Sequence, residues 1–260
     1  MNKNSVNTLT AMALLAGGTA GYFYWESLQA VPEVAPPIIM AEDNSPKFPL
    51  KIDASPNQPP LPSLIESDGF VEDAITTLLA NESLMQIFIN EKLIQNIVTT
   101  IDNLPGNSLP IKVMPIQTAA GSFITSGAGN TRVIHPDNAG RYIAYMNLVD
   151  AIDAKQLVQL YIRLYPLFQQ SYEDLGYPDK YFNDRLMYVI NDLLAAPDIE
   201  EPVNLIQPLV VYEFADPALE ARNIGQKIMM RIGSQHEAKL KAKLKEIKQE
   251  LLNHVSDIKP

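Results

Sequence analysis

The sequence predicts a mainly helical (α+β) domain with a small minor β-sheet, preceded by one transmembrane helix. Three observations lead to this fold class. Residues 4–25 carry no charge over about the length that crosses a bilayer. From Leu64 onward, apolar residues recur with the 3.6-residue period of helices. Short β-favouring runs lie within Leu109–Ile134 and Leu205–Phe214, which predicts a sheet of only a few strands.

The amino-terminal segment, residues 1–25, is predicted to be an uncleaved membrane anchor. Lys3 precedes the uncharged run, and an aromatic cluster typical of membrane interfaces closes it at Trp25. Because acidic residues follow, the amino terminus is expected in the cytoplasm and the rest in the bacterial periplasm, as in a single-pass inner-membrane protein. Two alternatives stay open. One is a signal peptide cleaved after Leu28–Ala30, and the other is a buried soluble helix, which the glycines of the run disfavour.

Residues 26–62 are predicted to form a proline-rich tether. The stretch Val31–Pro62 contains nine prolines and shows neither a helical nor a strand period. Proline fixes φ and removes a hydrogen-bond donor, so this stretch is expected to be extended, solvated and semi-rigid. A proline-rich ligand for a partner is the weaker alternative. Residues 63–260 are then one globular, mainly helical domain that ends in a lysine-rich amphipathic helix.

Within this domain, apolar periodicity, caps and helix breakers predict the order of the elements. Asp153 is placed at an N-cap, and Pro166 is expected to kink or split the helix that follows. Ser126–Asn130 has the length and glycine content of a hairpin loop. The predicted helices are Phe70–Ala80, Ser83–Leu104, Arg141–Ile152, Ala154–Gly176, Lys180–Ala196, a helix that begins at Pro217, and Glu237–Val255.

The last helix has the clearest pattern. Ser234 and Glu237 are spaced as a capping box at its start. Lysines occupy the faces outside one apolar stripe, so we expect a solvated helix docked along the domain. A partner-binding or coiled-coil helix, and contact with anionic lipid or nucleic acid, are the alternatives. The apolar stripe consists of Leu240, Leu244, Ile247 and Leu251.

Composition and motifs argue against several classes of function. The net charge of −10 is unfavourable for a nucleic-acid-binding protein. The chain has no cysteine, which excludes disulfides, thiol catalysis and cysteine-bound zinc. Its three histidines are far apart in sequence, and of the weak metal-ligand pair His135 and Asp137, the aspartate is expected to cap a helix instead. No nucleophile elbow or phosphate-binding loop is found. The sequence therefore indicates no catalytic residue, metal or cofactor.

The main polar candidate lies in the stretch YEFADPALEARN (Tyr212–Asn223), where a structural role is favoured over a functional one. Asp216 is placed at a helix N-cap with a proline at the next position, and Glu220 near the positive end of the helix dipole. Arg222 is expected to be partly buried and paired with a carboxylate. Gly225 is expected to let another element pack closely. The candidate cluster consists of Glu213, Asp216, Glu220, Arg222, Asp184 and Arg185.

Three runs carry a resemblance to a known family. They are DNLP (Asp102–Pro105), the run Tyr165–Leu186 and the run Tyr212–Lys227. Through these runs the chain resembles the proteobacterial domain of unknown function 3014, from about Leu61 to about Leu251. The resemblance implies an amino-terminal membrane segment, a proline-rich tether and a single domain. The family has no assigned activity, so the resemblance implies no catalytic residue.

Two functional hypotheses of different classes follow. The first is a non-enzymatic envelope module that is anchored in the inner membrane and binds another envelope protein. The second is a periplasmic enzyme or ligand-binding domain that acts on cell-wall material through acidic and aromatic residues. A cytoplasmic domain of inverted topology is a further alternative. The tyrosines of the second hypothesis are Tyr161, Tyr165, Tyr172, Tyr177 and Tyr181.

Overall fold

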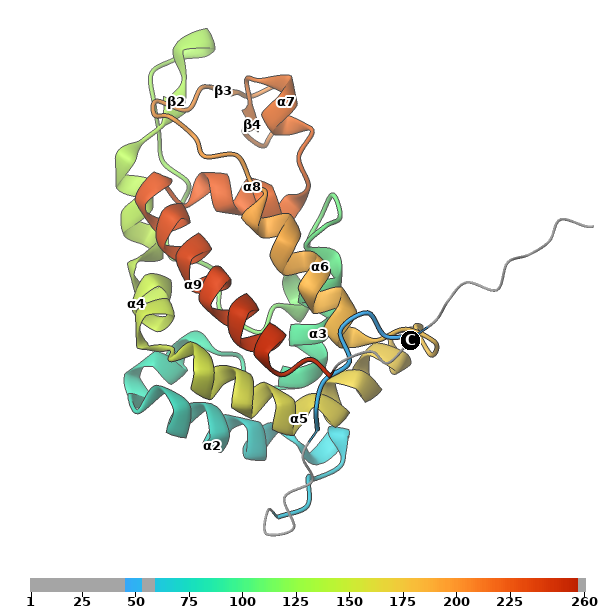
Figure 1. Ribbon diagram of the computed structural model, residues 1–260. Coiled ribbons are helices and arrows are strands. Elements are labelled where there is room, and N and C mark those ends of the chain that lie inside the picture. Colours follow the sequence, from blue (N-terminus) through green and yellow to red (C-terminus); the bar gives the residue numbers. More distant parts are fainter. Residues whose placement is uncertain (1–44, 53–58, 257–260) are drawn as a thin grey trace, which may run out of the picture. The chain divides into compact units, whose positions relative to one another are not determined.

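Four helices close a ring at the centre of the fold (Figure 1). Helices α3 (Leu93–Asn103) and α9 (Ser234–Asn253) each pack on both α5 (Ala154–Asp174) and α6 (Phe182–Leu194). Helix α2 (Asp68–Leu79) packs against α3 and α5. The apolar stripe of a helix has to be buried against a neighbour. In this arrangement each helix of the ring buries its stripe against at least two others.

The computed structural model describes residues 45–52 and 59–256. The predicted anchor (1–25) and most of the predicted tether lie outside the described residues. Within the described ranges, no helix combines the length and the hydrophobicity needed to cross a membrane. The mainly helical class with small antiparallel strand pairs is confirmed.

The described strands form two small sheets at one end of the helical ring, drawn at the top of Figure 1. Strand β1 (Thr125–Ser126) pairs antiparallel with β2 (Val133–Ile134), which confirms the predicted hairpin loop. Strand β3 (Leu205–Ile206) pairs antiparallel with β4 (Glu213–Phe214). A bridge between Val133 and Asn204 joins the two sheets. Both sheets of the described residues therefore lie at the same end of the domain.

Three shorter helices connect this end to the ring. Helix α4 (Ile143–Ala151) packs on α9, and α8 (Ile224–Arg231) contacts both α6 and α9. Helix α7 (Pro217–Glu220) is a single turn beside β4. The short 3₁₀ segments are Leu64–Glu66, Glu82–Ile87, Ile111–Val113, Gly129–Thr131 and Pro136–Tyr142.

Aromatic side chains fill the core where α5 meets α6. Phe182 is fully buried, and its ring stacks on Phe168 with centroids 5.5 Å apart. Tyr161 packs on Phe168 at 5.3 Å, and burial raises the pKa of Tyr161 well above its ordinary value. Its hydroxyl therefore stays protonated and lies 3.2 Å from the Asn183 side-chain oxygen, to which it donates. Tyr172 is buried in the same cluster.

A cavity of about 280 Å³ lies between the helices of the ring and α2. The cavity is partly open to the outside, and its surface is almost entirely apolar. The lining residues are Val71 and Ile75 of α2, Ile97 and Ile101 of α3, Leu157, Val158, Leu160, Tyr161, Leu164 and Phe168 of α5, Phe182, Leu186 and Ile190 of α6, and Leu244, Ile247 and Leu251 of α9.

Two aspartates cap backbone that is distant in sequence. The Asp68 carboxylate accepts the backbone N–H groups of Lys92 and Leu93, at the start of α3. The Asp184 carboxylate accepts those of Lys47 and Phe48, each at 2.8 Å. Both carboxylates thus satisfy amide donors that would otherwise be left without partners.

Part of the predicted tether lies on the domain. Phe48 packs against the apolar cluster shared by α5, α6 and α9, and Leu50 forms an antiparallel bridge with Val255. The Pro49 carbonyl accepts from Ser256 N at 2.8 Å, and Lys51 N donates to the His254 carbonyl at 2.9 Å. The proline-rich composition did not predict this contact, because composition carries no information about a distant partner.

Several predicted helices differ from the structure in their limits. The predicted helix Ser83–Leu104 is interrupted, because Lys92 adopts a left-handed conformation and α3 begins only at Leu93. Helix α5 runs through Pro166 without splitting. The predicted capping box is wrong: Ser234 contacts Glu201, and Glu237 is buried and pairs with Lys241 at 2.8 Å. The docked position of the last helix is confirmed.

Candidate functional site

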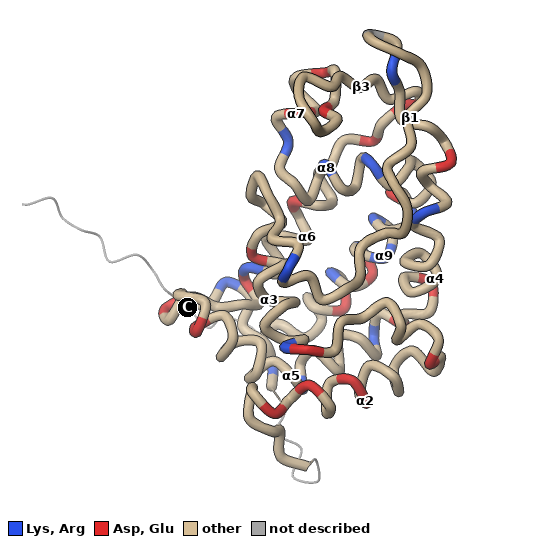
Figure 2. Tube along the Cα trace, turned by 180° about the vertical axis from the view of Figure 1, so that it is seen from behind, with Lys and Arg blue, Asp and Glu red and all other residues tan. Residues whose placement is uncertain are grey.

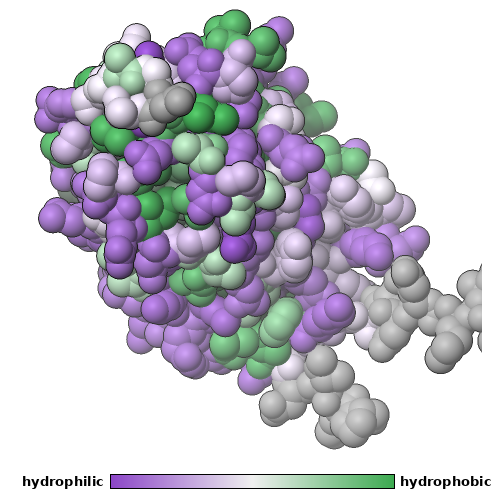
Figure 3. Space-filling view, turned by 90° about the horizontal axis from the view of Figure 1, so that it is seen from above, coloured by the Kyte–Doolittle hydropathy of each residue, from purple (hydrophilic) through white to green (hydrophobic). Residues whose placement is uncertain are grey.

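The hairpin formed by β3 and β4 exposes the most apolar loop of the described residues. Leu209, Val210 and Val211 are 85%, 87% and 65% exposed. The sequence analysis placed the run Leu205–Phe214 in the minor sheet, but only its two ends are strands. Pro208 lacks the N–H that a continuing strand would need, and the loop turns outward there. Figure 3 looks onto this end of the domain, where hydrophobic side chains reach the surface among hydrophilic ones.

Arg132 supports one side of the hairpin. Its guanidinium lies over the Tyr212 ring at 5.1 Å and donates to the Tyr212 hydroxyl at 2.7 Å. The Tyr212 ring also packs near Phe123, with centroids 5.9 Å apart and the rings tilted. A cation over an aromatic face, combined with a hydrogen bond, fixes the ring in one orientation.

Arg231 supports the other side. Its guanidinium lies 5.0 Å from the centre of the buried Phe214 ring and donates to the Tyr212 carbonyl at 2.9 Å. Burial lowers the pKa of Arg231, an effect opposed by the charge of Glu220. The guanidinium still carries its charge at neutral pH, because an arginine stays protonated over the whole physiological range. The two arginines therefore hold Tyr212 and Phe214, on either side of Glu213, at the base of the loop.

Glu220 completes this base. Its carboxylate accepts the Phe214 N–H at 2.8 Å and forms an ion pair with Lys227. Burial alone would raise the pKa of Glu220, but the hydrogen bonds from Lys227 and Phe214 outweigh it, so the net pKa is lowered. Glu220 was predicted to complement a helix dipole. It does lie in the first turn of α7, as predicted, and it also ties β4 to α8.

Asp216 occupies the predicted N-cap position. Its carboxylate accepts Ala218 N at 2.8 Å, with Pro217 as the first residue of α7. The helix that begins there was expected to continue, but it ends after Glu220. A second helix starts at Ile224, with Asn223 as its cap. Asn223 accepts Gln226 N and donates to the Asp192 carboxylate, which explains the break.

The prediction for Arg222 is wrong. Arg222 is exposed, and its guanidinium has no ion pair within the described part of the chain. It falls in the break between α7 and α8, so it leaves the face that a continuous helix would bury. The partly buried arginine of this region is Arg231, nine positions later. Gly225 behaves as predicted: a Cβ there would lie 2.9 Å from a Leu193 methyl group and 3.0 Å from the Leu104 carbonyl.

Asp184 and Arg185 do not join this cluster. Asp184 caps the backbone at Lys47 and Phe48, while Arg185 pairs with Asp102 at 2.8 Å. Tyr177 donates to the same Asp102 carboxylate at 3.2 Å. The six candidate residues therefore do not form one cluster: Glu213 and Glu220 lie at the hairpin, Asp216 caps α7, Asp184 and Arg185 make separate contacts, and Arg222 is exposed.

The last residues of α3 and the turn after it bring the three runs of the resemblance together. Asp102 meets Tyr177 and Arg185 from the second run. The carbonyls of Leu104 and Gly106 accept from Gly225 and Ile224, both at 2.8 Å, in the third run. Residues that are distant in the sequence thus meet at one place, where their hydrogen bonds and ion pair connect α3 to the two other runs.

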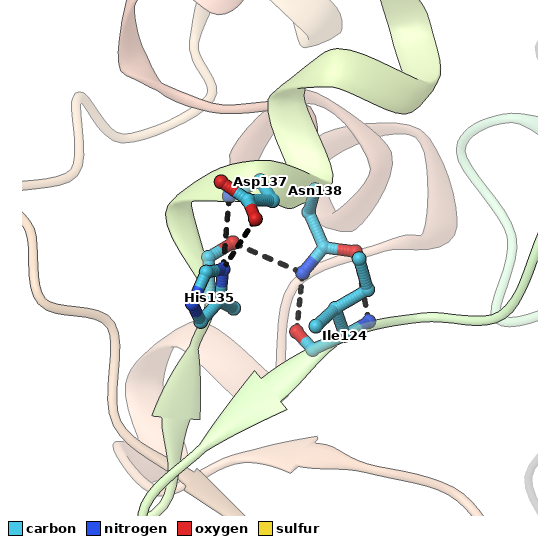
Figure 4. Close-up of polar contacts among 4 residues, drawn as sticks. All are labelled: Ile124, His135, Asp137 and Asn138. Carbon is cyan, nitrogen blue, oxygen red and sulfur yellow. Dashed lines mark hydrogen bonds and ion pairs between the residues drawn. The ribbon is translucent and has the colours of Figure 1, made fainter.

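His135 and Asp137 form a helix cap rather than a metal site (Figure 4). The ring nitrogen Nδ1 of His135 accepts Asp137 N at 3.1 Å, so the histidine is the cap and the aspartate is exposed. The buried Asn138 accepts from Ile124 N at 2.9 Å and donates to the Ile124 and His135 carbonyls, which fixes β1 to this turn. Within the described ranges, no group of three or more acidic or histidine side chains is positioned to hold a metal ion.

Residues 93–248 match the family described as Protein of unknown function (DUF3014). The matched stretch begins with the first residue of α3 and ends within α9, so it contains the helical ring, both sheets and the hairpin loop. The resemblance inferred from the three runs is confirmed, over a shorter stretch than Leu61–Leu251. No curated protein and no solved structure matches the chain significantly.

Proposed function

The chain belongs to the DUF3014 family, and on this premise we propose that it is a non-enzymatic binding module of the bacterial envelope. The observation that carries the proposal is the hairpin loop Leu209–Val211. Three consecutive aliphatic side chains are exposed there, on a base that two arginines and Glu220 hold in place. Consecutive exposed apolar side chains on a supported loop are typical of contact surfaces.

A protein is the partner that this loop fits best. Acidic residues flank the hairpin at Glu200, Glu201 and Glu213, and they would be repelled by the anionic surface of a bilayer. Figure 2 shows acidic and basic positions interspersed along the trace, while α2 carries acidic positions only. Of the lysines of α9, Lys239, Lys241 and Lys243 each pair with a carboxylate, which weakens the basic face that nucleic acid or anionic lipid would require. An apolar pocket on a second protein would bury the loop without that repulsion.

The location in the envelope is a second part of the proposal. It is supported by the uncharged run of residues 4–25, by Lys3 before it and by the interfacial aromatic residues at its end. Residues 1–25 would hold the chain in the inner membrane, with the amino terminus in the cytoplasm. The domain would then lie in the periplasm beyond a proline-rich spacer.

Site-specific cross-linking in cells tests the binding role. A photoreactive amino acid replaces Val210 in the full chain, and the matched control carries it at Ile111, an aliphatic residue that is 71% exposed outside the hairpin. We expect one protein to be cross-linked at position 210 and not at position 111, and the product to disappear in the Leu209→Ser, Val211→Ser variant. Equal products at both positions, or none at position 210, would contradict the proposal.

The location is tested separately by fusing alkaline phosphatase to the carboxyl end of the full chain. Because this enzyme is active only outside the cytoplasm, we expect an active fusion. An inactive fusion of normal abundance would place the domain in the cytoplasm and contradict the envelope role. The binding role of the loop could still be measured in that case.

The alternative, an enzyme or binding domain for cell-wall material, gains no specific observation. Tyr161, Tyr165 and Tyr172 pack in or against the core. Their rings contact other aromatic rings, as between Tyr161 and Tyr165 at 5.9 Å. The acidic candidates Asp184, Asp216 and Glu220 already accept backbone N–H groups.

A further inference from the structure

The cavity between the helices of the ring and α2 has an almost purely apolar wall. Of its lining residues, only Tyr161 carries a polar side-chain atom, and that hydroxyl already donates to Asn183. An ordered water usually makes two to four hydrogen bonds, and this wall supplies almost none, so water that enters the partly open space is held only weakly. The volume of about 280 Å³ is roughly twice that of an engineered apolar cavity of ~150 Å³ that stays dry and binds benzene. The space therefore suits an apolar occupant.

The wall favours a flexible aliphatic occupant over a planar one. The aromatic rings of the wall already contact one another, with Phe168 stacked on Phe182 at 5.5 Å and Tyr161 against Phe168 at 5.3 Å. The side chains that remain to face the space are branched aliphatic ones. Several of them, including Ile97, Ile101 and Leu160, are only partly buried because the space lies beside them.

A cation without a partner lies next to this wall. Arg163 of α5 sits between the lining residues Leu160 and Leu164 in sequence, and its guanidinium lies over the Phe70 ring of α2 at 5.1 Å. Its Nε atom is buried without a hydrogen bond, and within residues 45–52 and 59–256 no carboxylate pairs with the guanidinium. In a chain with net charge −10, a half-buried arginine without an acidic partner is available to an anion from outside.

We infer that the cavity binds the hydrocarbon chain of a fatty acid or acyl lipid, with Arg163 positioned to receive its anionic head group. The acyl chain covers the apolar wall and displaces the weakly held water. The head group stays at the α2–α5 edge, because the wall itself offers it no hydrogen-bond donor. This inference does not depend on the hairpin loop.

The probe is dodecanoic acid with a photoreactive diazirine in mid-chain, added to membranes that contain the full chain. We expect cross-links on peptides of α5, α6 and α9, and unlabelled dodecanoic acid should reduce them at least tenfold. Cross-links confined to residues 1–25 would mean that the probe reached the chain only through the bilayer, and would overturn the inference.

Cavity-filling variants distinguish the cavity from other apolar surfaces. Leu160→Trp and Ile101→Phe enlarge two partly buried lining residues, and Ile111→Phe is the matched control on an exposed aliphatic residue. We expect each lining variant to lose at least nine tenths of the labelling while its melting temperature is equal to or above that of the wild type. Unchanged labelling in both folded lining variants would overturn the inference. The inference would also be overturned if removing residues 1–44 were needed for the probe to label the cavity, because this segment would then be the occupant.

The role of Arg163 is tested by comparing a charged and a neutral probe. Arg163→Gln should weaken labelling by the diazirine fatty acid about tenfold and leave labelling by the corresponding alcohol unchanged. Equal loss for both probes would show that Arg163 acts only by supporting the wall, and would contradict the assignment of the head group.

Discussion

The helical ring and the hairpin end of this domain are held together by different interactions. The ring is a layer of apolar helix faces around a core of aromatic rings, with Phe182 fully buried between its neighbours. The hairpin end has strands of only two residues each, and arginines placed over aromatic rings hold it in place. The stability of the ring comes from buried apolar surface, whereas the stability of the hairpin end depends on a few directional contacts. The comparison predicts where substitutions act strongly and where they act locally.

The largest effect is expected in the ring. Phe182→Ala removes a buried ring that packs on Phe168, Tyr161 and Tyr172, so the free energy of unfolding should fall by about 3–5 kcal/mol. Urea denaturation followed by circular dichroism measures this change. The neighbouring Tyr181 is 37% exposed, and Tyr181→Ala is expected to cost much less. Similar losses for both variants would show that the aromatic core does not dominate stability.

The junction between ring and hairpin end is expected to show an intermediate effect. In Gly225→Ala, the new methyl group meets Leu193 and the Leu104 carbonyl at 2.9 and 3.0 Å, so the variant should lose about 1–3 kcal/mol. The matched control is Gly69→Ala in the first turn of α2, where a Cβ meets no atom within 4 Å. That variant should gain about 0.5–1 kcal/mol from helix propensity. Thermal unfolding compares the two, and equal shifts would refute close packing at Gly225.

At the hairpin end, the effect should be smaller and local. Arg231→Gln removes the contact with Phe214 and the hydrogen bond to the Tyr212 carbonyl, which should cost about 1–3 kcal/mol for opening the hairpin. Limited proteolysis within Gln207–Val211 should become faster. Arg222→Ala is the control, because Arg222 is exposed and unpaired in the described ranges, and it should change stability by less than about 0.5 kcal/mol. A larger loss of stability for Arg222→Ala than for Arg231→Gln would support the sequence-based expectation that Arg222 is partly buried and paired.

The smallest effect concerns pH. The pKa of Glu220 is lowered in the folded chain, so its pairing stabilises the fold above the unfolded pKa and is lost as pH falls through the folded pKa. The pair is partly exposed, so the loss should be only about 0.2–1 kcal/mol. Glu220→Gln should remove this part of the acid sensitivity, seen as a flatter stability profile below neutral pH. Asp216→Asn is the matched control for loss of a carboxylate, because asparagine also serves as an N-cap and position 216 is not part of the pair with Lys227.

Helix periodicity predicted much of the ring, because a buried helix face repeats locally in the sequence. The apolar spacing in α5, α6 and α9 was sufficient to place them to within a few residues. The helix ends that were predicted wrongly depend on partners that are distant in the sequence. Asp68 caps α3 from another helix, and Asn223 ends one helix and starts the next through Asp192. Neither partner can be read from neighbouring residues.

The candidate site was predicted less well than the fold. Asp216 and Gly225 were placed correctly, since cap and close-packing signals are local. Arg222 was chosen because it lay at the edge of an apolar face on a helix that proved to be broken. Arg132 and Arg231 were missed because a cation over an aromatic ring leaves no sequence pattern. The exposed loop had one signal, Pro208 inside an apolar run, which favours an interruption over a continuous strand.

The docked segment Lys47–Leu50 also gives the domain a mechanical property. Because Leu50 pairs with Val255, the chain enters and leaves the folded domain at one place. A pull on the chain before residue 45 would load the Asp184 cap and the hydrogen bonds at Pro49 and Lys51 before it reached α2. These contacts would yield first and lengthen the connection by several residues, so a moderate force could be absorbed while the helical ring stays folded.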